Sequence, residues 1–207
     1  MKVCALISGG KDSLFAIHCV VASGHEVVAV GHIAPSAGGE PDSEMYQSVA
    51  TEGIKTVAAA LELPLFVQVS KNKSNCSQLE YTPSDGDEVE DLLLLLDNVK
   101  SHHDITAVCC GALLSDYQRI RVESVCQRVG LVNLAPLWQV DQKTYIEDLT
   151  ALGFHNILVK VASLGLNKKH IGATLESVTP HLINLEQKYG VHPAGEGMLV
   201  IIQIRSL

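Results

Sequence analysis

The sequence is short of basic residues: 15 Lys and Arg stand against 23 Asp and Glu, and the formal net charge is −8. This balance argues against broad, non-specific binding to nucleic acid, although it leaves a local basic groove open. Long hydrophobic runs are missing as well. Polar residues interrupt the N-terminal apolar run at Ser8, and acids flank the run Leu92–Leu96. Neither run therefore predicts a signal peptide or a membrane span.

Recognisable cysteine and histidine motifs are also missing. The six cysteines are irregularly placed, and no two of them have the Cys-x-x-Cys spacing of zinc and redox sites. We therefore expect reduced, mostly buried thiols, as in a cytoplasmic protein. The nine histidines contain no His-Glu-x-x-His pattern, which argues against a metal site built from them. The length of 207 residues allows one large domain or two small ones.

What the chain does have is an unusual turn after its first apolar run. Residues 6–13 read Leu-Ile-Ser-Gly-Gly-Lys-Asp-Ser, and an apolar helical stretch follows. Adjacent glycines let the backbone approach a ligand closely, and the N–H groups that open the helix attract anions. The turn therefore predicts a phosphate or pyrophosphate site with these residues as ligands: Ser8, Gly9, Gly10, Lys11, Asp12 and Ser13. An ordinary turn, with Asp12 or Ser13 capping the helix, is the alternative.

Strand-like and helix-like segments alternate through the first two thirds of the chain. We expect strands at 2–7, 26–33, 65–69 and 105–110, and helices at 14–23, 43–63, 88–101 and 114–129. This alternation predicts an α/β fold, a parallel sheet with helices on both faces. Ligands of such sheets bind beyond the carboxyl ends of the strands, where Gly31, His32 and Gly111 fall.

The remaining third of the sequence predicts a smaller lobe. We expect a short extended piece at 134–138, a helix at 145–152 and a strand at 157–161. A helix at 171–189, interrupted by Pro180, follows, and the apolar tail could form another strand.

A second unusual stretch runs from Gly111 to Glu123 and contains the string Asp-Tyr-Gln-Arg-Ile-Arg-Val-Glu. On a helix, Asp116, Arg119 and Glu123 share one face, and Tyr117 and Arg121 share a neighbouring one. A solvated charged face would explain the spacing alone. The position directly after the fourth strand, at the ligand edge of the sheet, favours a site.

Residues 8–13, 111–123, 131–138 and 190–197 together resemble the diphthine–ammonia ligase family, the diphthamide synthetases of the N-type ATP pyrophosphatase (PP-loop) superfamily. The string on 116–123 is the specific part of the resemblance, whereas the glycine turn marks the superfamily. The resemblance implies an adenine nucleotide alpha-hydrolase-like, Rossmann-like fold. It implies a PP-loop ATP-binding domain at 1–133 and a smaller substrate-side lobe at 134–207.

The activity that the resemblance implies is the ATP-dependent amidation of diphthine on translation elongation factor 2. The diphthine carboxylate would become an acyl-adenylate, ammonium would supply nitrogen, and AMP and pyrophosphate would leave. ATP and Mg²⁺ are the expected cofactors, with Asp12 near the metal. We expect a cytoplasmic protein that contacts neither membrane nor nucleic acid directly.

The resemblance also assigns candidate site residues. Residues 8–13 would hold the departing phosphates, and Gly31, His32 and the strand end at 5–7 would border adenine and ribose, with Gly111 beside them. The catalytic candidates are Lys11, Asp12, Arg119 and Arg121. The substrate-binding candidates are Asp116, Tyr117, Gln118, Arg119, Arg121, Glu123 and Glu196.

The C-terminal end departs from the family pattern. The family has further polar residues after Glu196, whereas this chain continues with an apolar tail, so we expect an altered or truncated end. Two alternatives stay open. One is another PP-loop ATP pyrophosphatase that acts on tRNA, and the other is a nucleotide-binding variant without catalysis.

Overall fold

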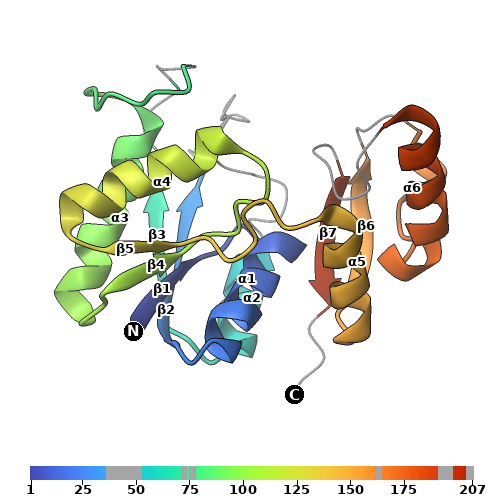
Figure 1. Ribbon diagram of the computed structural model, residues 1–207. Coiled ribbons are helices and arrows are strands. Elements are labelled where there is room, and N and C mark those ends of the chain that lie inside the picture. The colour runs from blue at the N-terminus through green and yellow to red at the C-terminus, as the bar shows by residue number, and fades with distance from the viewer. Residues whose placement is uncertain (36–52, 71–73, 75–77, 162–164, 191–197, 204–207) are drawn as a thin grey trace. The chain divides into compact units, whose positions relative to one another are not determined.

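The computed structural model describes residues 1–35, 53–70, 74, 78–161, 165–190 and 198–203 (Figure 1). The chain divides into two compact units, Met1–Trp138 and Gln139–Leu207. None of the helices in the described ranges combines the length and apolar character that a membrane crossing requires.

The first unit is built on a parallel sheet with the strand order β3-β2-β1-β4-β5. Its strands are β1 (Lys2–Leu6), β2 (Glu26–Ala34), β3 (Leu65–Val69), β4 (Ala107–Cys109) and β5 (Val132–Leu134). Its helices are α1 (Lys11–Ala22), α2 (Ile54–Ala60), α3 (Glu88–His102) and α4 (Asp116–Val129). Figure 1 shows α1 and α2 on one face and α3 and α4 on the other. The predicted α/β fold, a parallel sheet with helices on both faces, is confirmed.

Burial explains why the central strands are apolar throughout. Val3, Cys4 and Ala5 of β1 are completely buried, as expected for a parallel strand that is covered on both faces. On one face, α3 and α4 pack together over the sheet and bury Leu92 and Val125 in a common core. Local signals fix the ends of these two helices.

The helix ends follow ordinary capping rules. The Asp87 carboxylate accepts a hydrogen bond from the Val89 N–H at 2.9 Å and starts α3. Ser115 caps α4 in the same way, by accepting from the Gln118 N–H at 3.3 Å. Gly130, with φ at +68°, ends α4 in the left-handed conformation that favours glycine.

Several predicted boundaries were wrong. α1 begins at Lys11 rather than Leu14, because Gly10 already occupies its N-cap position. β4 is shorter than the predicted strand at 105–110. The extended piece predicted at 134–138 is misplaced: the strand is β5, and the chain turns after it, where the Trp138 N–H donates to Ala135 O at 3.1 Å. Most of the first half of the helix predicted at 43–63 lies outside the described residues.

The second unit contains α5 (Gln142–Ala151), β6 (His155–Val161), a 3₁₀ turn (Lys168–His170), α6 (Leu175–Tyr189) and β7 (Met198–Gln203). β6 and β7 pair antiparallel, so the expected strand in the tail is confirmed. The predicted interruption at Pro180 is wrong, because α6 runs through it. Pro180 stands in the second turn, where its missing N–H removes one backbone hydrogen bond near the start of the helix.

Candidate functional site

The turn between β1 and α1 is held in shape by two serines. The Ser13 hydroxyl donates to Gly10 O at 2.9 Å and accepts from the Ser8 N–H at 3.4 Å. The Ser8 hydroxyl in turn accepts from the Gly10 N–H at 3.4 Å. Gly9 has φ at +80°, and no side chain caps α1 at Gly10. The helix therefore presents its N-terminus to the turn, as anion-binding turns do.

Lys11 and Asp12 form an ion pair at the first turn of α1. The Lys11 side chain is 3% exposed, and its Nζ lies 3.0 Å from Asp12 Oδ1 and 3.1 Å from Oδ2. Asp12 is more exposed and lines a cavity at the carboxyl edge of the sheet. The buried Lys11 ammonium thus pairs with the carboxylate of Asp12, a residue that lines the cavity.

Gly111 allows the end of β4 to touch the first turn of α1. A Cβ at this position would lie 2.8 Å from both the Asp12 carbonyl carbon and the Ser13 nitrogen, which are backbone atoms. No side chain fits there without a shift of the backbone. Gly111 therefore joins two distant parts of the sequence in one wall of the cavity.

His32 fastens the end of β2 to the residue that precedes the turn. Its Nδ1 lies 2.8 Å from Ile7 O, and because a carbonyl only accepts, Nδ1 carries the proton. Burial lowers the pKa of His32, and the hydrogen bond to Ile7 opposes that shift. The ring is 4% exposed, and its Nε2 has no hydrogen-bond partner among the described residues. A neutral imidazole is thus the favoured form at neutral pH.

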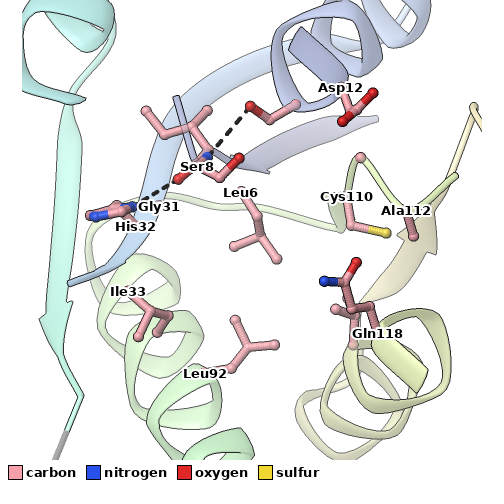
Figure 2. Close-up of a pocket in the computed structure, with 14 residues that line it drawn as sticks. Leu6, Ser8, Asp12, Gly31, His32, Ile33, Leu92, Cys110, Ala112 and Gln118 are labelled. Atoms are coloured by element: carbon pink, nitrogen blue, oxygen red, sulfur yellow. Dashed lines mark hydrogen bonds between the residues drawn. The ribbon is translucent and has the colours of Figure 1, made fainter. Parts of the chain in front are cut away.

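The cavity lies where the chain reverses its direction of winding, between β1 and β4, which is the usual ligand position in such sheets. Its walls come from the ends of β1, β2 and β4 and from α1, α3 and α4 (Figure 2). The apolar side chains that line it include Leu6, Ile33, Leu92 and Val122. An anion-binding turn beside an apolar slot suits a ligand with a phosphate chain and a flat, apolar ring.

The charged residues at the start of α4 pair with one another. Arg119 contacts Asp116 Oδ1 at 3.3 Å and Glu123 Oε2 at 2.9 Å, which confirms that these three residues share a face. The Arg119 guanidinium carbon also lies 4.8 Å from the centre of the Trp138 ring. Asp116, Arg119 and Glu123 are not among the residues that line the cavity. Their proposed parts in substrate binding stay predictions.

Arg121 lies in a different environment from Arg119. Its side chain is fully buried, and its guanidinium carbon lies 3.3 Å from the centre of the Tyr117 ring and 5.2 Å from that of Tyr81. It donates to Gln78 O at 2.9 Å and to Tyr117 O at 3.2 Å. The Tyr117 hydroxyl lies 2.9 Å from Ser74 Oγ. These contacts hold the segment before α3 against α4, and a role for Arg121 or Tyr117 in substrate binding stays a prediction.

Gln118 is the substrate-binding candidate on α4 that does line the cavity, together with Val122 one turn later. Figure 2 shows its carboxamide reaching into the cavity from the side opposite His32 and Ile33. Glu196, the last candidate, lies outside the described residues.

Sequence reasoning missed several cavity residues. Cys110 and Ala112 carried a signal, because they flank Gly111 at the end of a predicted strand. Leu92 carried none, because it belongs to a run of leucines in which any member could face the core.

The described cysteines agree with the expectation of buried thiols. Cys4, Cys109, Cys110 and Cys126 are buried, Cys19 is half-buried, and all five are free thiols. Burial raises the pKa of Cys4 and of Cys126 to about 12, and it raises that of Cys110, which lines the cavity. The thiolate form is therefore disfavoured at neutral pH, which argues against a cysteine nucleophile in this cavity.

Comparison of the sequence with known families and proteins gives one consistent result. The family model described as the diphthamide synthase N-terminal domain matches residues 1–133. A diphthine–ammonia ligase from Danio rerio is 45% identical over 201 residues, which cover 95% of this chain and 79% of the relative. The Homo sapiens relative of the same name is 44% identical over 202 residues and is covered to 76%. A Schizosaccharomyces pombe relative of that name is 45% identical over 199 residues, which are 33% of its length.

Proposed function

This chain belongs to the diphthine–ammonia ligase family, and from that premise we propose how its cavity serves a ligase reaction. The protein is an enzyme of the ligase class. In the proposed reaction it uses ATP to amidate diphthine, a modified histidine of translation elongation factor 2, with ammonium as the nitrogen source. The partner and the substrates would place it in the cytoplasm.

The reaction has two balanced steps. A carboxylate oxygen of diphthine attacks the α-phosphorus of ATP, the bond from that phosphorus to the bridging oxygen breaks, and pyrophosphate leaves with the electron pair. Ammonia, formed when ammonium loses a proton, then attacks the acyl carbon of the adenylate. The acyl carbon–oxygen bond breaks, AMP leaves, and the nitrogen loses a proton to give the amide. Neither step needs a nucleophile from the protein.

The turn at residues 8–13 is the observation that carries this proposal. Its geometry supports binding of the β- and γ-phosphates through backbone N–H groups, the serine hydroxyls and the N-terminus of α1. The apolar slot between Leu6, Ile33 and Leu92 would take adenine, and Gly31 and His32 would border the base and the ribose. Alignment and charge stabilisation are then the protein's main contributions to rate.

Mg²⁺ fits the oxygen donors beside the turn. The Asp12 carboxylate faces the cavity, and Mg²⁺ prefers to combine one or two carboxylates with phosphate oxygens and water. No cluster of three or more His, Cys, Asp or Glu side chains suited to a metal occurs in the ranges that the structure describes, so phosphates would complete the coordination. When bound, the ion would neutralise charge on the phosphates. Lys11 would keep Asp12 in place.

The test is product formation by the purified chain. We expect AMP and pyrophosphate to appear with ATP, ammonium and elongation factor 2 that carries diphthine, and not with the unmodified factor. Asp12→Asn should slow AMP release at least about 100-fold, because the carboxylate meets the metal and the phosphates. Asp97→Asn, an exposed position on α3, is the matched control and should behave like the unchanged protein. Tight ATP binding without cleavage would contradict the proposal.

A further inference from the structure

The α4 side of the cavity offers a neutral amide where the sequence suggested a cation. Gln118 and Val122 stand one helical turn apart and both line the cavity. Arg119, next to Gln118 in sequence, is held by Asp116 and Glu123 and is not a lining residue. Figure 2 shows Gln118 directed into the cavity, whereas Arg119 is not one of the described residues that line it.

Few charged side chains occur among the described residues that line the cavity. Among the described residues that line the cavity there is one carboxylate, Asp12, and no lysine or arginine. Lys11 precedes Asp12 in the sequence, and its ammonium lies within 3.1 Å of the Asp12 carboxylate. On the side opposite His32 and Ile33, Figure 2 shows Asp12, Cys110 and Gln118, and the Gln118 carboxamide is the polar group that α4 contributes to the described lining.

This charge pattern matches a reaction with reactants of both signs. The carboxylate and the α-phosphate are anions, whereas ammonium is a cation. A lysine or arginine at position 118 would attract the first two and repel the third. A carboxamide donates from its nitrogen and accepts at its oxygen, so it can serve an anionic oxygen and an N–H group without a net charge.

We propose that Gln118 is a catalytic residue that binds the reacting acyl group. Its Nε2–H donates to an oxygen of the carboxylate and of the adenylate formed from it, and its Oε1 accepts an N–H of the incoming ammonia. The amide forms and breaks no covalent bond itself. This inference rests on the proposed function and deepens it, because it names the side chain that meets the nitrogen donor.

The decisive variant is Gln118→Met, which keeps the length of the side chain and removes both polar atoms. We expect kcat to fall about 100-fold, the usual effect of losing one hydrogen-bond donor at a reacting oxygen. The KM for ATP should change by less than about threefold, because the contact is made with the acyl group rather than with the nucleotide. Gln127→Met, exposed on the same helix, is the matched control and should leave both constants unchanged.

A second variant tests the argument from charge. Gln118→Lys should raise the KM for ammonium at least about tenfold, and added salt should reduce that increase. Gln118→Glu, nearly the same shape, should instead lose kcat, because it repels the carboxylate. Circular dichroism spectra and melting temperatures equal to those of the unchanged protein establish that these variants fold. If Gln118→Met does not fold, the kcat of Gln118→Glu is measured in its place.

The possible outcomes separate this inference from the proposed function. An unchanged protein that releases no AMP with the diphthine substrate overturns both. An active protein in which Gln118→Met keeps its kcat overturns only the role of Gln118. A variant that changes only the KM for ATP also overturns this role, since that result would place Gln118 at the nucleotide.

Discussion

The turn at residues 8–13 and the first two turns of α4 were both predicted as binding elements, yet they meet the cavity in different ways. The turn brings Ser8, Asp12 and Ser13 to it directly. α4 brings Gln118 and Val122, while the charged residues of its first two turns pair with one another or pack on aromatic rings. A site made by backbone geometry can be located from a short string, whereas a site made by side chains on a helix depends on the rotation of that helix.

The largest expected effect comes from a substitution at Gly111, which packs against the turn. Gly111→Ala would place a Cβ against backbone atoms of Asp12 and Ser13, so either α1 or β4 must shift. We expect AMP release to fall at least about 100-fold, because a displacement near 1 Å disturbs alignment that strongly. The free energy of unfolding should fall by about 1–3 kcal/mol, as for other overpacked sites. Initial rates and urea titrations measure the two quantities.

Gly53→Ala is the control for that experiment. A Cβ at Gly53 meets no atom within 4 Å, and its φ of −80° suits alanine. Both activity and stability should stay near those of the unchanged protein. Equal losses in the two variants would remove the argument that Gly111 shapes the turn.

The two arginines of α4 should differ in what they stabilise. Arg121→Ala removes the buried guanidinium that packs on the Tyr117 and Tyr81 rings and donates to the Gln78 carbonyl, so we expect a loss of about 2–4 kcal/mol in the free energy of unfolding. Arg119→Ala should cost less than about 1 kcal/mol, because its ion pairs are partly exposed. Urea denaturation of both variants measures this difference. A larger cost for Arg119 would reverse the structural distinction between the two residues.

A smaller effect concerns pH and His32, whose ring is hydrogen-bonded to Ile7, the residue before the turn. Because burial lowers the pKa of His32, the unfolded chain takes up a proton at pH values where the folded chain does not. Stability should therefore decline as the pH falls below about 6.5 and be unaffected by this group above it. His32→Asn should flatten the decline between about pH 6.5 and 5.

The melting temperature, measured at each pH in that interval, checks the prediction. His18→Asn, at an exposed position on α1, is the control and should leave the slope unchanged. If the melting temperature falls equally steeply with pH in the unchanged protein and in His32→Asn, another group takes up the proton.

The sequence predicted the fold well where backbone preferences decide it. Apolar runs located β1, β2 and β3, and the glycine pair located the turn, because local conformation sets both. The position of β5 was missed, since three residues beside Pro136 give too short a pattern. The sequence also indicated which residues of α4 share a face. It could not indicate which face meets the cavity, because packing of α4 on α3 and β5 sets the rotation.

The wall of the cavity that contains Gly111 also contains Asp12 and Ser13, which lie about 100 positions earlier in the first unit. During synthesis, the turn at residues 8–13 leaves the ribosome long before Gly111 has been added to the chain. A nascent chain must therefore finish most of its sheet before it can retain nucleotide. Ligand would accordingly draw late folding intermediates towards the finished enzyme by mass action and leave early ones untouched.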